Sequence, residues 1–162
     1  MRTYRQVVTA AAHALGVSNG RADHVGRQLQ AAAIVPTGTG GRVPAHLTHE
    51  QCGALTLGVL SGAEMRDVAA TVRRFAALEI DGIQFPAKSA PPTLGRLLAS
   101  VLAGAVPGVC LTLDIDAHTA VVTGVGDQPL QFGSPTNTGR AIRRTASIAP
   151  RALHTLATSI QQ

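Results

Sequence analysis

Two short stretches of the chain carry side chains of the kinds that hold metal ions or transfer protons. The first places His46, His49 and Cys52 three residues apart, a spacing that brings side chains near one face of a helix. Zinc sites usually close around four ligands, and the sequence offers no second Cys/His pair close by. We interpret the histidines as part of a helix start and Cys52 as a small buried residue, and we predict no metal site here.

The second stretch alternates Asp114, Asp116 and His118. On a strand this spacing puts both carboxylates on one face, with the histidine at the following turn, where they could hold a cation or act as an acid and a base. A solvated strand face beside a hairpin explains the same pattern. A hydrolase or metal enzyme built on these three side chains is therefore a remote alternative.

A glycine-rich stretch, Gly38–Arg42, has the composition of a phosphate-binding loop but not its sequence. It lacks the terminal Lys-Ser/Thr pair, and no predicted strand and helix flank it in the required order. We predict that the protein is not an enzyme and that it binds no cofactor.

The basic side chains are concentrated at the two ends of the chain. The net charge is +5; residues 1–50 carry five arginines against two acidic side chains, and residues 135–162 carry four arginines and no acidic side chain. This distribution suits a polyanionic partner, although a solvated arginine surface without a partner is the plainer alternative. With one Tyr, three Phe and no Trp, the chain has few rings on which single-stranded nucleic acid could stack.

The composition predicts a folded protein of the cytoplasm. Hydrophobic residues make up 45% of the chain and charged residues 14%, which disfavours global disorder. Cys52 and Cys110 lie far apart, so no disulfide framework is indicated and a reduced setting is expected. The first residues lack the apolar core of a signal peptide, and no stretch is long enough to span a bilayer, so we expect no membrane partner.

The clearest local pattern is a pair of helices joined by a tight turn. Apolar residues recur at helical spacing over residues 4–15, and this helix is predicted to end at Gly16. Ser18 or Asn19 can cap a second amphipathic helix. Its apolar stripe is predicted at Ala22, Val25, Leu29 and Ala32 or Ala33. Two short helices joined by a Gly-containing turn are how helix-turn-helix proteins present a helix to the DNA major groove.

The next segment predicts a wing and two further helices. Residues 36–44 are rich in glycine and look like a short basic hairpin, flanked by short strands at Ile34–Val35 and at Val43. A third helix is predicted to begin at Thr48 with a capping box, and a fourth to span residues 64–78.

The pattern changes after residue 79. Proline and glycine cluster over 80–92, so the predicted domains are 1–79 and 80–162. The second domain is predicted to hold helices over 94–102 and 150–160 and strands over 109–115, 119–125, 130–132 and 140–146. The predicted fold class is α+β, with an N-terminal helical winged helix-turn-helix unit followed by a small antiparallel sheet with helices on one face.

The N-terminal third of the chain resembles a known family. Leu15–Ser18, followed by Val25, Arg27 and Leu29, is similar to the Leu-Gly-Val-Ser turn and the Val-x-Arg-x-Leu recognition helix of bacterial and phage helix-turn-helix repressors. Six residues separate Ser18 from Val25, which is more than usual in that family. Either the turn is longer here or the second helix begins near Arg21. The stretch over 27–48 is also similar to small winged-helix regulators of phages and prophages of GC-rich bacteria.

This resemblance implies a set of residues that contact DNA. Side chains of the second helix face the major groove, where Arg favours guanine and Gln favours adenine. The N-terminus of the helix holds a phosphate, and an arginine of the wing reaches a phosphate or the minor groove. Arg2 and Arg5 lie near the DNA backbone. The predicted DNA-binding residues are Ser18, Asn19, Arg21, His24, Arg27, Gln28 and Arg42.

Taken together, these inferences favour a cytoplasmic DNA-binding transcriptional regulator of phage, prophage or bacterial origin, with double-stranded DNA as its partner. One small recognition unit is usually too weak for tight specific binding, so we expect a homodimer, or a partner protein, held through the C-terminal half. The alternative is a protein-interaction module, such as a phage-encoded modulator of a host factor. Its working surface would be the helices over 48–79 and the sheet, and its arginines would serve solubility alone.

Overall fold

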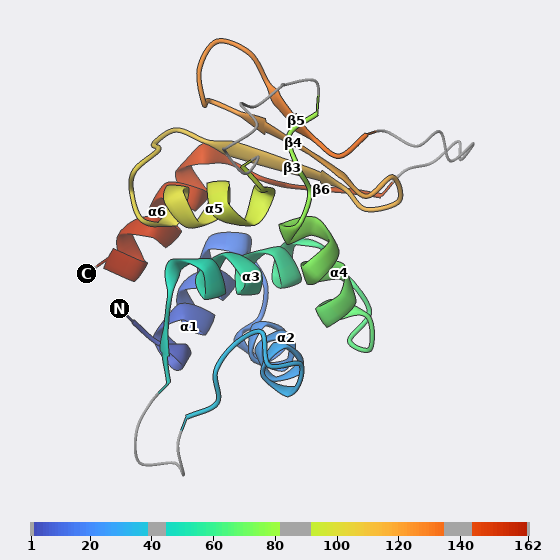
Figure 1. The fold of residues 1–162 in the computed structure, drawn as a ribbon. Helices are drawn as coiled ribbons and strands as arrows, with labels where there is room; N and C mark the ends of the chain where they lie inside the picture. The colour runs from blue at the N-terminus through green and yellow to red at the C-terminus, as the bar shows by residue number, and fades with distance from the viewer. Residues whose placement is uncertain (1, 39–44, 82–91, 135–143, 162) are drawn as a thin grey trace.

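The computed structural model describes residues 2–38, 45–81, 92–134 and 144–161 of the chain, which form six helices and two small antiparallel sheets (Figure 1). The fold is thus a mixture of helix and sheet, as the sequence predicts at the level of the α+β class. Across the described ranges, no helix is both long enough and apolar enough to cross a lipid bilayer.

The first half of the chain is mainly helical. A two-stranded sheet pairs Arg2 with Leu47 and Thr3 with His46. The fourth helix is shorter than predicted because the residues before it form a turn, in which the Asp67 amide donates to the Glu64 carbonyl at 2.8 Å. The elements in order are β1 (Arg2–Thr3), α1 (Tyr4–Leu15), α2 (Asn19–Ala31), β2 (His46–Leu47), α3 (His49–Leu60) and α4 (Val68–Ala76).

Helix α3 occupies the centre of the molecule. The predicted capping box is confirmed: the Thr48 hydroxyl accepts from the Gln51 amide, and the Gln51 side chain accepts from the Thr48 amide. All residues from Cys52 to Val59 are buried, because α1, α2, α4 and α5 pack around this helix. Gly58 allows a close crossing, since a Cβ there would press on the side chain of Val25 in α2.

The second half of the chain builds a four-stranded antiparallel sheet and two helices. The strand order is β5-β4-β3-β6, so three consecutive strands form a meander and the last strand joins its other edge. In the register, Leu111 lies opposite Val122 on one side and Ile148 on the other. The elements are α5 (Leu94–Leu102), β3 (Cys110–Asp114), β4 (Thr119–Thr123), β5 (Leu130–Phe132), β6 (Thr145–Ile148) and α6 (Pro150–Gln161).

The helices and the sheet are stacked in layers, with α5 and α6 directly beneath the four-stranded sheet and α1 and α3 beneath them (Figure 1). The buried face of the sheet, which includes Leu111, Leu113 and Phe132, belongs to the same hydrophobic cluster as Val7 and Leu55 of the N-terminal helices. The boundary predicted near residue 80 stays a prediction, and buried residues on both of its sides share one core.

Two predicted strands differ from the observed ones. Ile34 and Val35 lie in a bend rather than in a strand. The two-stranded sheet in this half of the chain is instead formed by β1 and β2. Val43, the predicted partner, lies outside the described residues. The last strand was expected over 140–146 but runs from Thr145 to Ile148, and residues 135–143 lie outside the described ranges.

Candidate nucleic-acid interface

Helices α1 and α2 are joined by three residues. Gly16 has a left-handed backbone with φ of 65° and ends α1, since its amide donates to the carbonyls of Ala12 and His13. Ser18 then caps α2, its hydroxyl accepting from the Arg21 amide at 3.2 Å. Ser18, rather than Asn19, is thus the N-cap of α2. The helix begins directly after it at Asn19 and not near Arg21.

The connection also matches the Gly-x-Ser-x-Gly pattern of hydrolase nucleophiles, over residues 16–20. A nucleophile elbow of that kind lies between a strand and a helix. Here the serine lies between two helices, and its hydroxyl accepts from the backbone amide of Arg21. The observed geometry is therefore that of a helix cap.

The inner face of α2 is fixed against both α1 and α3. Ala22, Val25 and Leu29 are buried, as the predicted apolar stripe requires. Gly26 allows the ring of Tyr4 in α1 to lie directly against the α2 backbone, and Gly58 of α3 receives Val25. These contacts hold α2 rigidly and leave its opposite face for other contacts.

The outer face of α2 carries polar and basic side chains. Arg21, His24 and Arg27 are exposed and Gln28 is half-buried. A shallow hollow of about 300 Å³ on this face is lined by His24, Arg27 and Gln28, together with Gly20 and Asp23. Helix α2 lies on the far side of α1 and α3 from the four-stranded sheet (Figure 1).

A chain of polar contacts orients Arg27. Its guanidinium lies 2.8 Å from the Asp23 carboxylate one turn earlier, although 74% of the arginine side chain is exposed. The Tyr4 hydroxyl donates to the Asp23 carbonyl at 3.2 Å and to its carboxylate at 3.3 Å. Burial, and then the neighbouring Asp23 charge, raise the pKa of Tyr4 to about 12, so the hydroxyl remains a donor near neutral pH.

The far end of α2 is held by a contact that sequence reasoning missed. Arg73 of α4 donates from Nη2 to the carbonyl of Ala32 at 2.8 Å, where α2 ends and its last carbonyls carry partial negative charge. The two residues are 41 positions apart, and no local pattern links them.

The structure brings most of the predicted contact residues onto one element. Ser18 and Asn19 lie at the start of α2 and are exposed, and Arg21, His24, Arg27 and Gln28 follow within three turns. Arg42 and most of the expected wing lie outside the described residues. No protein-family model, curated protein or solved structure matches the chain.

The first cluster of metal-ligand residue types is divided between surface and core. His46 is exposed in β2 and His49 is exposed at the start of α3, whereas Cys52 is fully buried within that helix. Burial raises the pKa of the Cys52 thiol to about 11. Within the described parts of the chain, no group of three or more His, Cys, Asp or Glu side chains is placed to hold a metal ion.

The second cluster is engaged in contacts that build the β3–β4 turn. Asp114 accepts from the Ala117 amide at 2.9 Å. Asp116, whose side chain is only 4% exposed, accepts from the Nε and Nη2 of Arg144 at 3.1 and 3.0 Å. His118 has a left-handed backbone with φ of 54° and packs edge-on against Phe75 of α4, with ring centroids 6.2 Å apart.

Proposed function

We propose that the chain is a duplex DNA-binding protein that inserts α2 into the major groove. The observation that carries the proposal is the outer face of α2, which presents Arg21, His24 and Arg27 on a helix locked against α1 and α3. Arginine recognises guanine through O6 and N7, and Gln28 on the same face suits adenine. Asp23 pairs with Arg27 at 2.8 Å, and in this proposal the pairing directs the guanidinium toward one base edge rather than along the DNA backbone.

Phosphate contacts complete the proposed interface. The exposed start of α2, at Ser18 and Asn19, offers backbone amides and the positive end of a helix dipole to a phosphate group. Arg42 of the proposed wing supplies a second contact, to a phosphate or to the minor groove. The excess of arginine at both ends of the chain adds long-range attraction to a polyanion and makes binding sensitive to salt.

The proposal extends to a cytoplasmic transcriptional regulator of bacterial or phage origin with a winged helix-turn-helix. One recognition helix covers too few base pairs for tight specific binding, so the active species is a dimer with two half-sites about one helical turn apart. In this proposal the sheet and its helices provide the surface that holds the second copy or another protein.

The test is binding to a labelled random duplex library at two salt concentrations, followed by selection of tight binders. The Arg27→Ala/Arg42→Ala double variant is compared with Arg96→Ala/Arg151→Ala, which removes the same charge from exposed positions of α5 and α6. We expect wild-type affinity to fall steeply with salt, the first variant to lose binding, and the second to retain most of it. No binding at low salt by the folded wild type would overturn the proposal and direct the search to protein partners.

A further inference from the structure

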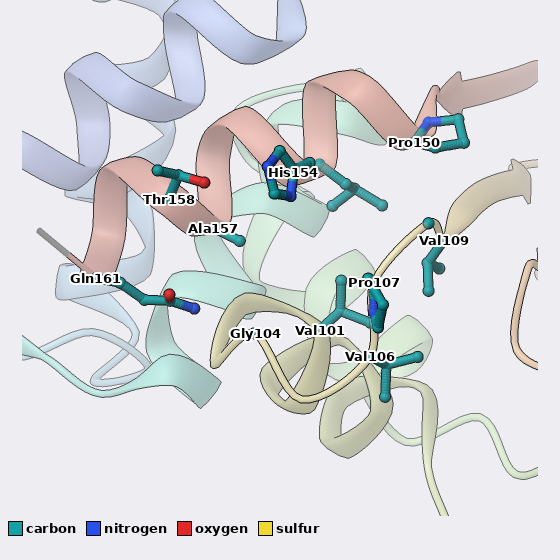
Figure 2. Close-up of a pocket in the computed structure, with 12 residues that line it drawn as sticks. Val101, Gly104, Val106, Pro107, Val109, Pro150, His154, Ala157, Thr158 and Gln161 are labelled. Atoms are coloured by element: carbon teal, nitrogen blue, oxygen red, sulfur yellow. The ribbon is translucent and has the colours of Figure 1, made fainter.

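A cavity lies between α6 and the segment that connects α5 to β3 (Figure 2). Its volume is about 150 Å³. One wall is a single face of α6, on which Leu153, Ala157 and Gln161 recur at helical spacing. The opposite wall includes Val101 at the end of α5 and Val109 just before β3. The cavity is thus separate from the outer face of α2.

The frame of the cavity is fixed by a polar contact at one end. Gln161 donates from Nε2 to the carbonyl of Leu102 at 3.2 Å, which ties α6 to the end of α5. Gly104 has φ of 78°, and a Cβ there would collide with the Gln161 amide group. Glycine at position 104 therefore permits the contact that keeps the two walls in place.

The inner wall of the cavity is aliphatic. Val101 and Val109 also border a second, much smaller space between α5 and the sheet, whose other lining residues are Leu94, Leu97, Leu98, Leu111 and Val122. The floor of the larger cavity is thus continuous with the aliphatic packing between helix and sheet. An occupant with an apolar body would lose its contact with water against this wall.

The α6 side of the cavity adds hydrogen-bonding groups without a fixed charge. His154 and Thr158 line it together with Gln161 (Figure 2). Neither the His154 imidazole nor the Thr158 hydroxyl makes a hydrogen bond to another residue in the described parts of the chain. The described lining contains no Asp, Glu, Lys or Arg, so no permanently charged side chain there would balance a charged ligand.

We propose that this cavity binds a small neutral molecule with a ring-sized apolar body and one hydroxyl or amide group. A cavity of about 150 Å³ is large enough for one six-membered ring. The apolar body lies against Val101, Val109 and Leu153, and the polar group meets the Thr158 hydroxyl. The proposal does not depend on DNA binding.

The test is a ¹H–¹⁵N NMR titration of the full chain with cyclohexanol. We expect saturable shifts confined to amides around the cavity, including Gly104 and Thr158, with a dissociation constant of about 1 mM for a ligand of this size. Cyclohexanecarboxylate, which has the same ring and a negative charge, should bind at least tenfold more weakly. No saturable shift, shifts spread over the surface, or equal binding of the carboxylate would overturn the proposal.

Three variants test whether the ligand binds in this cavity. Ala157→Leu fills the cavity from α6 and should abolish the shifts. Thr158→Val removes only the hydroxyl and should weaken binding about fivefold, the worth of one hydrogen bond. Thr155→Val is the matched control, because that hydroxyl donates to the Arg151 carbonyl within α6 and does not line the cavity. If Ala157→Leu does not fold, the comparison of Thr158→Val with Thr155→Val still tests the proposal. Equal affinity of these two variants for cyclohexanol would contradict it.

Discussion

The hydroxyl of Tyr4 lies where any residue larger than glycine at position 26 would place its Cβ. This close approach joins α1 to the middle of α2, and it also brings the hydroxyl to Asp23. Gly26 is unfavourable for helix formation, but it lets α1 pack closely against α2. It therefore determines the position of the helix whose outer face carries Arg27. The contact links the packing of the core to the geometry of the proposed interface.

We expect Gly26→Ala to destabilise the protein by up to about 2 kcal/mol. The gain in helix propensity, about 1 kcal/mol, is outweighed because Tyr4 must leave its place, and overpacking typically costs about 1–3 kcal/mol. Gly20→Ala in the same helix is the matched control, because a Cβ there meets nothing within 4 Å. It should be neutral or stabilising. Urea unfolding followed by circular dichroism measures both, and equal effects would contradict the role given to Tyr4.

The stability of the protein should fall between neutral and mildly acidic pH in a way that depends on His118. Burial, and then the Arg74 charge, lower the pKa of His118, while the Ile115 backbone and the carboxylates of Asp114 and Asp116 act in the opposite direction. The unfolded state therefore binds the proton at higher pH than the folded state does. The stabilisation is present above pH 6.5, the ordinary histidine value, and is lost as the pH falls through the lowered pKa.

The matching variant is His118→Asn, because asparagine tolerates the left-handed backbone at this position. Urea unfolding at pH 7.5 and pH 5 should show a smaller loss of stability for this variant than for the wild type. His13→Gln, which alters an exposed histidine on α1, should keep the wild-type loss. A wild-type loss that persists unchanged in His118→Asn would show that other groups cause it.

Because the Asp116 carboxylate is buried, its ion pair with Arg144 should be costly to break from either side. Asp116 is almost fully buried and also accepts from the backbone amide of Arg144 at 2.8 Å, so Asp116→Asn should cost about 2–3 kcal/mol. Arg144 is 70% exposed, so in Asp116→Asn its guanidinium stays solvated, whereas Arg144→Ala leaves the buried Asp116 carboxylate without this cation and should cost at least as much. Arg151→Ala, at an exposed position nearby in sequence, is the control. Urea unfolding of the single and double variants measures the coupling, and additive effects would contradict it.

Much of the fold follows from local sequence because its elements carry their own start and stop signals. Ser18 and Thr48 begin helices, Gly16 ends one, and the alternation after residue 109 predicts the β3–β4 hairpin. The pairing of β1 with β2 could not be predicted, since two-residue strands have no periodicity and their partners are far apart in sequence. The shorter α4 reflects a turn at Glu64–Asp67 within a pattern that is otherwise helical.

The candidate interface could be predicted only in part, for a related reason. The outer face of α2 follows from the helical positions of Arg21, His24 and Arg27, and their exposure agrees with that pattern. The contacts that hold the helix in place, from Tyr4 to Asp23 and from Arg73 to Ala32, join residues brought together by folding. Sequence spacing identifies a helix face well, but it carries little information about which distant side chains fix that face.

The role of Asp23 provides a sharp test of how α2 would recognise DNA. If Asp23 orients Arg27 toward a base, Asp23→Ala should reduce discrimination between a selected duplex and a scrambled one by about tenfold, as expected when a bidentate base contact is weakened. The same change removes a negative charge from the interface, so affinity for the scrambled duplex should rise about two- to threefold.

Arg27→Ala should instead lower affinity for both duplexes, because it removes a positive charge together with the base contact. Asp127→Ala is the control for charge alone, since this residue is exposed in the β4–β5 turn, on the sheet side of the molecule away from α2 (Figure 1). It should leave discrimination unchanged. Fluorescence anisotropy with both duplexes at two salt concentrations separates these cases. Loss of affinity for both duplexes in Asp23→Ala would mean that Asp23 supports the helix itself, and that the orientation of Arg27 is not what confers specificity.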